Sequence, residues 1–185
     1  MLSSATDLPH PVARSHSRLV AIIGGGPAGL IAADYLSQQG HPVALFDAMP
    51  SVGRKFLQAG KGGMNLTHSE PYADFVQRYG SAADFMAPLL AQFGADALRD
   101  WARGLGVETF IGSSGRVFPS DMKAAPLLRA WLQRLREQGV QFHVRHQWLG
   151  WQSDEQLRFV TPDGERIVRA DACLFALGGA SWPRL

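Results

Sequence analysis

The hydrophobic pattern near the start of the chain predicts a strand, a helix and a second strand in close succession. The apolar run 19–23 is stopped by three glycines, as expected for a parallel strand buried on both faces. From Pro27 onward apolar residues recur at helical spacing, and Gly40 marks the end of that helix. A second apolar run, 43–47, follows at once. Together these elements have the length of a strand–helix–strand unit, about 30 residues.

The pattern changes after the second strand. Residues 49–69 contain four glycines and little periodicity, so we predict a long ordered loop there. Loops of that length in compact domains are usually functional. Beyond it, the hydrophobic pattern predicts three helices and two short strands. These are the helices 82–93, 95–105 and 125–138, and the strands 107–111 and 116–118.

The last part of the chain is predicted to be rich in strands. A strand over 140–144 comes first. Turn residues at 153–154 and 162–164 then divide 148–170 into short segments, which indicates an antiparallel meander. A final buried strand covers 172–176. The alternation of strands and helices predicts an α/β fold of the Rossmann type, with a parallel sheet and a small antiparallel meander.

Composition narrows the class of protein without changing this picture. The 185 residues are 46% apolar and 18% charged, which is ordinary for a globular domain. Eighteen Lys and Arg against 16 Asp and Glu leave a formal net charge of +2, so we predict a small-molecule substrate and no nucleic-acid partner. No segment approaches the roughly 18 apolar residues of a membrane span, and we predict no membrane association.

The single cysteine, Cys173, cannot form an internal disulfide, and the lack of a second cysteine excludes a thiol relay. It lies within the last apolar run, where a small core residue is the simpler interpretation. We therefore assign Cys173 no chemistry and predict a cytoplasmic protein. We predict no metal site, and no acid–base pair identifies catalytic residues.

Candidate chemistry begins at the turn between the first strand and its helix, Gly24-Gly25-Gly26-Pro27-Ala28-Gly29. Gly24, Gly26 and Gly29 fit the dinucleotide-binding pattern. The first permits a tight turn, the second lets a diphosphate approach the backbone, and the third lets the helix pack against the strand. The helix N-terminus then offers N–H groups and a positive dipole end to the diphosphate. A glycine turn with no ligand is the alternative.

Asp47 closes the second strand 18 residues after Gly29. This is close to the spacing of about 20 residues at which a carboxylate accepts hydrogen bonds from an adenosine ribose. Ala48 and Met49 follow it, so no arginine stands beside it to hold a 2′-phosphate. The alternative is a surface acid at a strand end. Because FAD and NAD share an ADP half, the turn and this carboxylate do not distinguish them.

Three longer segments, taken together with the glycine turn, are more specific than the turn alone. On residues 24–29, 52–67, 115–119 and 177–183, the sequence resembles the BaiN/RdsA-like (YhiN-like) family of FAD-dependent oxidoreductases. The resemblance covers nearly everything from Leu19 onward. Within the second segment the family usually shows Ser-Gly-Gly-Gly-Arg-Cys-Asn. This chain has Ala59-Gly60-Lys61-Gly62-Gly63-Met64-Asn65 there, which suggests a subgroup.

The resemblance implies a glutathione-reductase-like FAD-binding domain whose first turn holds the ADP half of FAD. It also implies that the loop from Arg54 to Asn65, with Gly62 and Gly63, folds over the pyrophosphate and ribityl chain. Physical chemistry agrees, because Arg54 and Lys55 can neutralise phosphate charge and glycines let backbone N–H groups approach a cofactor. A solvated basic loop is the alternative.

Gly178 and Gly179 follow the last predicted strand, at the carboxyl edge of the sheet where open α/β folds bind ligands. In the family this position resembles a second glycine contact with the cofactor. Relatives are also longer than this chain. We therefore expect residues 19–185 to be an incomplete FAD-binding domain, without the substrate domain and a returning C-terminal segment, and residues 1–18 to be a flexible tail.

The resemblance implies an enzyme in which NAD(P)H reduces FAD and the flavin passes a hydride to an organic acceptor. The family's link to activated carbon–carbon double bonds suggests that class of acceptor. The alternatives are a non-catalytic flavin-binding or tRNA-modification partner, a plain NAD-binding domain, or an inactive fragment of the enzyme. The acceptor, the choice between NADH and NADPH and the oligomeric state are left open by the sequence.

Overall fold

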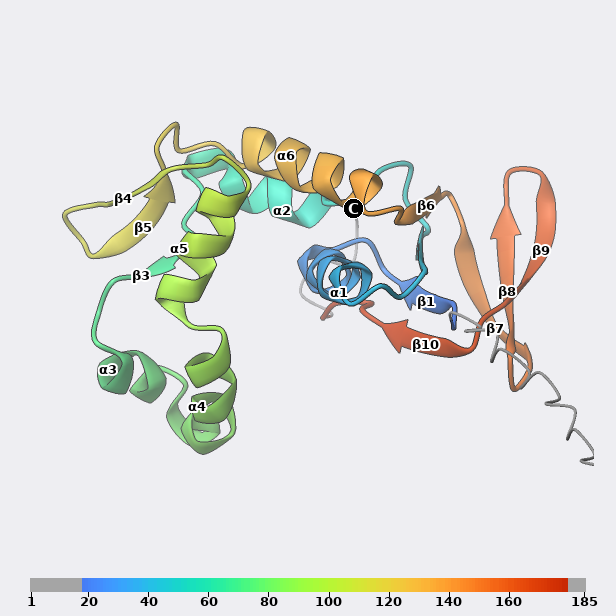
Figure 1. Ribbon diagram of the computed structural model, residues 1–185, viewed down its shortest axis with the longest axis horizontal. Coiled ribbons are helices and arrows are strands. Elements are labelled where there is room, and N and C mark those ends of the chain that lie inside the picture. The colour runs from blue at the N-terminus through green and yellow to red at the C-terminus, as the bar shows by residue number, and fades with distance from the viewer. Residues whose placement is uncertain (1–17, 180–185) are drawn as a thin grey trace, which may run out of the picture.

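A four-stranded parallel sheet forms the centre of the computed structural model, which describes residues 18–179 (Figure 1). Its strands run in the order β10-β1-β2-β6, all parallel to their neighbours. This arrangement confirms the predicted Rossmann-type α/β fold. The strands are β1 (Val20–Ile23), β2 (Val43–Asp47), β6 (Gln141–Val144) and β10 (Ala172–Phe175). Residues 1–17 of the predicted tail 1–18, and residues 180–183 of the last family-like segment, lie outside the described residues.

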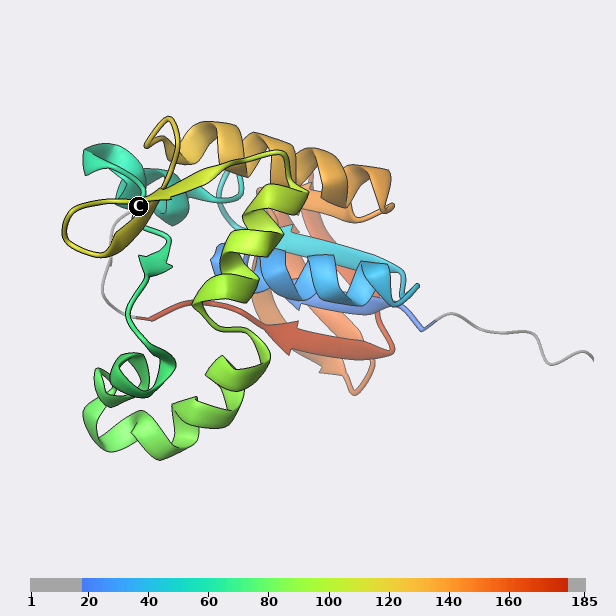
Figure 2. The same ribbon diagram turned by 60° about the vertical axis from the view of Figure 1, so that its left-hand side comes forward.

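The two faces of the sheet are covered by different layers, because alternate side chains of a strand point in opposite directions. Ile22 and Leu45 pack against α1 (Pro27–Gln38) and α6 (Ala124–Glu137). Their neighbours in sequence pack on the other face against an antiparallel meander, which both ribbon views place across the sheet from α1 and α6 (Figures 1 and 2). The meander consists of β7 (Gln147–Ser153), β8 (Gln156–Thr161) and β9 (Gly164–Arg169).

The segment predicted as a long loop contains regular structure, so that prediction was wrong. Helix α2 spans Arg54–Ala59, a 3₁₀ turn follows at Gly60–Gly62, and the two-residue strand β3 covers Thr67–His68. Only Phe56 of α2 is buried, against the core formed with α6. A six-residue helix with one buried side chain shows no measurable hydrophobic period, which explains the error.

A helical arm and a small sheet occupy the other end of the molecule. The arm contains α3 (Tyr72–Gln77), a 3₁₀ turn (Gly80–Ala82) and α4 (Ala83–Gln92), and α5 (Ala95–Gly104) leads back to the core. The small sheet pairs β3 with β5 (Arg116–Pro119) and β5 with β4 (Thr109–Ile111). In both ribbon views α3 and α4 project away from the parallel sheet (Figures 1 and 2). No residue of α4 is buried.

A buried carboxylate joins three helices. Asp34 of α1 is 1% exposed and accepts hydrogen bonds from Gln38 Nε2 at 2.6 Å and from Trp101 Nε1 of α5 at 3.1 Å. It also forms an ion pair with Arg134 of α6. The arginine guanidinium lies 5.8 Å from the centre of the Trp101 ring. These partners satisfy the carboxylate oxygens inside the core, which offsets the cost of burying a polar group.

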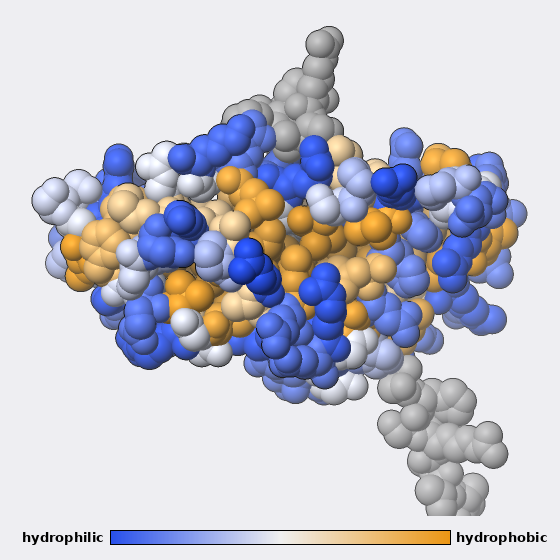
Figure 3. Space-filling model, turned by 90° about the horizontal axis from the view of Figure 1, so that it is seen from above, coloured by the Kyte–Doolittle hydropathy of each residue, from blue (hydrophilic) through white to orange (hydrophobic). Residues whose placement is uncertain are grey.

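The surface combines hydrophilic and apolar side chains. Seen from above, hydrophobic residues are visible across the middle of this face as well as at its two ends (Figure 3). Phe110 and Ile111 of β4 are 41% and 49% exposed, and Ile167 of β9 is 54% exposed. Within residues 18–179, no helix is both long enough and apolar enough to span a membrane.

Candidate functional site

The turn between β1 and α1 is shaped by contacts that exclude side chains. Gly24 has a φ of +112°, and a Cβ on it would lie 2.3 Å from the carbonyl oxygen of Ala176. A Cβ on Gly29 would lie 1.9 Å from the carbonyl oxygen of Gly24, so α1 approaches the turn at a distance that only glycine permits. A Cβ on Gly26 would meet no atom within 4 Å. Gly24 and Gly29 are therefore fixed by packing, whereas Gly26 borders open space.

The N-terminus of α1 faces the same space. Gly26 is its N-cap residue, no side chain caps this end, and Pro27 occupies the first turn. The N–H groups of a helix start and the positive end of its dipole attract anions. The turn and the helix therefore offer an anion site without any charged side chain.

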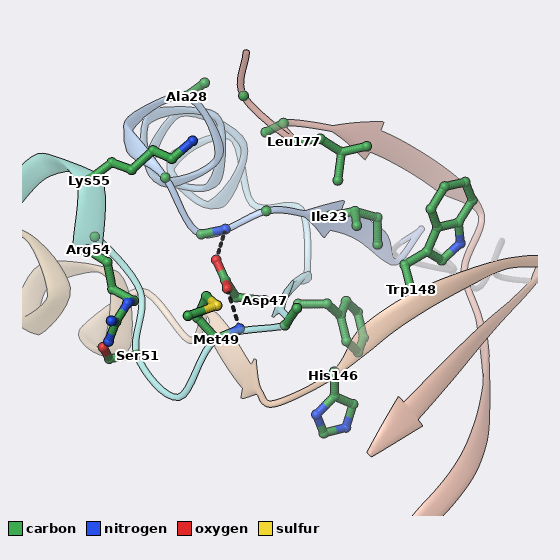
Figure 4. Close-up of a pocket in the computed structure, with 18 of the residues that line it drawn as sticks. Ile23, Ala28, Asp47, Met49, Ser51, Arg54, Lys55, His146, Trp148 and Leu177 are labelled. Carbon is green, nitrogen blue, oxygen red and sulfur yellow. Dashed lines mark hydrogen bonds between the residues drawn. The ribbon is translucent and has the colours of Figure 1, made fainter. Parts of the chain in front are cut away.

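Asp47 ends β2 beside this turn. Its carboxylate accepts hydrogen bonds from the backbone N–H groups of Gly25 at 2.6 Å and Met49 at 2.8 Å (Figure 4). Each carboxylate oxygen thus receives one bond and keeps further acceptor capacity for a ligand. The backbone oxygen of Asp47 accepts a hydrogen bond from His146 N at 2.9 Å, which joins β2 to the segment after β6.

Two cationic residues of α2 line the same cleft as the turn. Gly53, the N-cap of this helix, has a φ of +71°, and its N–H donates to the carbonyl oxygen of Gly25 at 2.7 Å. This bond anchors α2, so Arg54 and Lys55 lie on the α2 side of the cleft drawn in Figure 4. The Nε of Arg54 is buried and has no hydrogen-bond partner among the described residues. Lys55 Nζ lies 3.8 Å from the position that a Cβ on Gly178 would take.

These groups border one cleft of about 530 Å³. It lies at the carboxyl edge of the parallel sheet, where open α/β folds bind their ligands. The turn after β1, the end of β2, the start of α2 and the segment after β10 all contribute to it. Eight residues predicted to bind the cofactor line it: Gly24, Gly26, Pro27, Ala28, Asp47, Arg54, Lys55 and Gly178.

The other five predicted residues are not part of the cleft lining. Gly29 packs against Gly24 behind the turn. Gly179 is exposed beyond Gly178. Gly62 ends the 3₁₀ turn after α2 and is also exposed. The contact of these glycines with a cofactor stays a prediction.

Gly63 and Asn65 lie beside the small sheet. A Cβ on Gly63, where φ is +110°, would lie 2.9 Å from the terminal methyl carbon of Met122. With its amide oriented so that nitrogen donates, Asn65 reaches the carbonyl oxygen of Thr67 at 2.8 Å. Both residues therefore have local structural partners, and their predicted cofactor contact is untested.

Sequence reasoning missed the cleft wall that comes from the end of β6 and the start of β7. His146, Gln147 and Trp148 line the cleft because β6 pairs with β2, so both strands end at the same edge. A signal was available, since these residues directly follow a predicted strand at its carboxyl end. Using it requires the strand order, which the sequence does not show. The other unpredicted lining residues include Ile23, Phe46, Met49, Ser51 and Leu177.

Two histidines lie between the parallel sheet and the meander, and His143 is stacked on the ring of Phe46. The His143 ring centre lies 4.7 Å from that of Phe46 and 5.3 Å from that of His146. Burial lowers the pKa of His143, and the nearby His146 and Arg166 lower it further. His146 Nδ1 lies 2.8 Å from the carbonyl oxygen of Val144. The packing therefore favours a neutral imidazole at His143.

The residues of the cleft fit a dinucleotide with an ADP half. Arg54 Nε, His146 Nε2 and Trp148 Nε1 are buried without hydrogen-bond partners among the described residues, and all three residues line the cleft. Because these nitrogens are buried, they expose no surface to a ligand; the Asp47 carboxylate and the Arg54 and Lys55 side chains supply the charged groups of the cleft. The open space at Gly26 lets a diphosphate approach the backbone.

A family model described as the HI0933-like protein Rossmann domain matches residues 18–185. The chain belongs to this family. The HI0933-like family is the FAD-dependent family that the glycine turn and the longer segments resemble, so the predicted family is confirmed. The general class, a flavin-dependent oxidoreductase family, is thereby established for the matched part.

Two curated relatives share this HI0933-like region at moderate identity. The D-amino acid dehydrogenase of Dechloromonas aromatica is 30% identical over 81% of this chain and 37% of its own length. The ribosomal RNA dihydrouridine synthase of Haemophilus influenzae is 27% identical over 89% of this chain and 41% of its own length. The chain thus spans about two fifths of these relatives.

Solved flavoenzymes share the fold of the HI0933-like chain. A flavocytochrome c3 fumarate reductase matches 89% of this chain and 34% of its own with a TM-score of 0.67 and 20% identity. The 3-ketosteroid-Δ4-(5α)-dehydrogenase of Rhodococcus jostii matches 89% of this chain and 47% of its own with a TM-score of 0.63 and 13% identity. At these identities the likeness shows the fold alone.

Proposed function

We propose that this chain binds FAD in the cleft at the carboxyl edge of its parallel sheet and forms the cofactor-binding part of an oxidoreductase. The convergence of an uncapped helix N-terminus, the Asp47 carboxylate and two cations of α2 on one cleft carries the proposal. Family membership supports the choice of FAD over NAD, which the cleft by itself does not make.

Different residues of the cleft are proposed to bind different parts of the cofactor. The first turn of α1, with Arg54 and Lys55, neutralises and orients the diphosphate. Asp47 uses its remaining acceptor capacity for the ribose hydroxyl groups, and Gly26 keeps the space beside the backbone open. When bound, FAD supplies the hydride chemistry that none of these side chains can perform.

We infer an overall reaction in which NAD(P)H gives up a hydride and an activated carbon–carbon double bond is reduced; bound FAD would supply the hydride-transfer chemistry. The acceptor gains that hydride at one carbon and a proton at the other, and NAD(P)H is oxidised. The dihydrouridine synthase relative supports this acceptor class, because forming dihydrouridine saturates a double bond conjugated to a carbonyl group. Binding residues for the acceptor are not assigned.

A second candidate function follows from the same relative, whose name identifies ribosomal RNA as its substrate. In this version the acceptor is a uridine base within RNA. The sequence predicts no nucleic-acid partner, because the net charge is only +2. RNA binding that weakens steeply with added salt would support the candidate, since phosphate contacts release counterions. Salt-independent or absent binding would leave a small molecule as the acceptor.

The absorbance spectrum of the purified protein tests the proposed function. We expect flavin absorbance that copurifies or appears on reconstitution with FAD, and that bleaches under anaerobic conditions with NADH or NADPH. A colourless protein that cannot be reconstituted and binds NAD would contradict the FAD assignment. A flavin that neither nicotinamide reduces would retain the cofactor assignment and reject NAD(P)H as the donor.

A further inference from the structure

Residues 70–96, which include the helical arm, are both apolar and acidic. Phe85, Leu89 and Phe93 recur every four residues along α4 and its C-cap, and they are 71%, 47% and 44% exposed. Residues four apart lie on one side of a helix, so these side chains form an apolar stripe. The same segment contains four carboxylates and one arginine. A surface that complements the arm must therefore be apolar and positively charged.

Most carboxylates of the arm have no cation beside them. Glu70 forms an ion pair with Arg78. Asp74, Asp84 and Asp96 form no ion pair among the described residues. Asp84 is exposed in the first turn of α4, directly before the apolar stripe. The arm thus presents unpaired negative charge next to exposed apolar surface.

The surface of α2, the 3₁₀ turn after it and α6 has the opposite charge. Residues 53–63 and 120–137, here called the basic face, contain seven lysines and arginines against two carboxylates. The small net charge of the whole chain therefore hides a separation between an acidic arm and a basic face. Both ribbon views show α2 and α6 apart from α3 and α4, so the arm does not cover the basic face of its own chain (Figures 1 and 2).

Two lysines and an apolar side chain lie together on the basic face where α6 begins. Gly60 packs closely against Ala124, since a Cβ on Gly60 would lie 2.5 Å from the Cβ of Ala124. Lys61 and Lys123 are the chain neighbours of these two residues, so both lysines lie on the same part of the face. Both are exposed, and neither forms an ion pair among the described residues. Met122, next to them, is 42% exposed.

We propose that the helical arm of one copy of this chain binds the basic face of a second copy. Asp84 then faces Lys61 and Lys123, and Phe85 packs on the apolar surface at Met122. In a dimer with two-fold symmetry this contact forms twice, because each arm meets the other copy's basic face. Pairing of arm with arm is disfavoured, since it brings like charges together. The inference does not depend on the cofactor assignment.

Sedimentation velocity of the 185-residue chain tests this inference. The experiment uses the Ala172→Lys background, which places a charge on the outer edge of β10 and so suppresses association through that edge. We expect a monomer–dimer equilibrium that weakens as salt rises from about 0.1 M to about 1 M, because salt screens surface charges. Phe85→Ala should raise the dissociation constant by about tenfold, the effect of losing an interface anchor. A chain that stays monomeric at all concentrations would overturn the inference.

Charge reversal identifies the two surfaces that meet. Asp84→Lys alone should abolish the dimer, and so should the double variant Lys61→Glu and Lys123→Glu. An equal mixture of these two proteins should restore it, because reversed charges then face each other in one contact and native charges in the other. Asp154→Lys is the matched control, since it makes the same charge change at an exposed turn outside the arm. This control should leave the dimer unchanged.

Other modes of association give different results. A dimer that Asp84→Lys strengthens, and that the lysine variant does not affect, would mean that arm pairs with arm and would reject the inference. Equal weakening by Asp154→Lys and Asp84→Lys would reject it too, because net charge would then govern association. If circular dichroism shows that Asp84→Lys is unfolded, the effects of Phe85→Ala and of salt decide.

Discussion

Gly26 and Gly29 belong to one turn, yet substitution should affect them in different ways. A Cβ on Gly26 meets no atom within 4 Å, whereas a Cβ on Gly29 would lie 1.9 Å from a backbone oxygen. We expect Gly26→Val to keep its fold and lose dinucleotide binding, because the side chain enters the space the diphosphate needs. Gly29→Val should lose the fold itself. Thermal melting of both variants measures whether the fold is kept, and ADP titration measures whether binding is lost.

Of the two variants, Gly26→Val tests the position of the diphosphate directly. A folded variant that binds ADP or FAD with wild-type affinity would show that the diphosphate lies elsewhere. Gly29→Val supplies the contrast, since it changes the same turn through packing and should melt well below the wild type or fail to fold.

His143 predicts a pH dependence of stability. Burial and neighbouring His146 and Arg166 lower its pKa in the folded protein, whereas the unfolded chain titrates near the ordinary value of about 6.5. Stability from the neutral imidazole is therefore fully present above about pH 6.5 and is lost as the pH falls from there through the folded pKa. Urea unfolding between about pH 5 and 8, where histidines commonly titrate, should show the free energy of unfolding decreasing toward acid pH.

A variant without the titrating ring isolates this contribution. His143→Phe should flatten the acid slope while keeping a ring stacked on Phe46. The exposed His41 provides the control, and His41→Gln should leave the slope unchanged. An equally steep slope in His143→Phe would assign the pH dependence to other groups.

The buried carboxylate of Asp34 stabilises the packing of three helices, because its partners lie on α1, α5 and α6. Asp34→Ala should lower the free energy of unfolding by about 3–5 kcal/mol, since it leaves Arg134 and the Trp101 N–H without their partner. Asp100→Ala removes an exposed carboxylate paired with Arg103 and should cost less than about 1 kcal/mol. Denaturant unfolding compares the two. Equal losses would mean that Asp34 has no special structural role.

Long periodic elements were predictable from the sequence, and short ones were not. The pattern over 125–138 predicts α6, which the structure places at Ala124–Glu137, and the buried run 43–47 matches β2. Helix α2 has six residues and one buried side chain, so its sequence carries no period. Its position depends on Phe56 packing against α6, a contact between distant segments.

The candidate site was predictable only where a local motif carries it. The glycine turn and Asp47 follow known spacings within one strand–helix–strand unit, and the structure brings them together. Trp148 and His146 enter the same cleft only because β6 lies next to β2. That neighbour relation comes from the packing of the whole sheet, so no short pattern in the sequence identifies it.

For the whole molecule, the outer edge of β10 predicts self-association. Among residues 18–179 no strand pairs with this edge, and Phe175 is 44% exposed there. Unpaired apolar edges are templates for pairing with other chains. We expect light scattering to show concentration-dependent association of the 185-residue chain, reduced by Ala172→Lys at the edge. Gln39→Lys adds the same charge at an exposed turn and should not reduce it.

A chain that stays monomeric at all concentrations would contradict association through the β10 edge. So would an equal reduction of association by Gln39→Lys and Ala172→Lys. The expectation of an incomplete FAD-binding domain stays a prediction. Its direct test is the amount of flavin that the chain retains during gel filtration.

The place of β1 between β2 and β10 has a consequence for how the protein is made. β2 follows β1 closely along the chain, but β10 comes almost at the end of the 185 residues. Pairings between distant segments form slowly, and a nascent chain presents its N-terminal part first. The glycine turn therefore leaves the ribosome long before Ala176 and Gly178, which complete its surroundings. If the proposed cleft binds a dinucleotide, we expect binding only after β10 has been translated and has paired with β1.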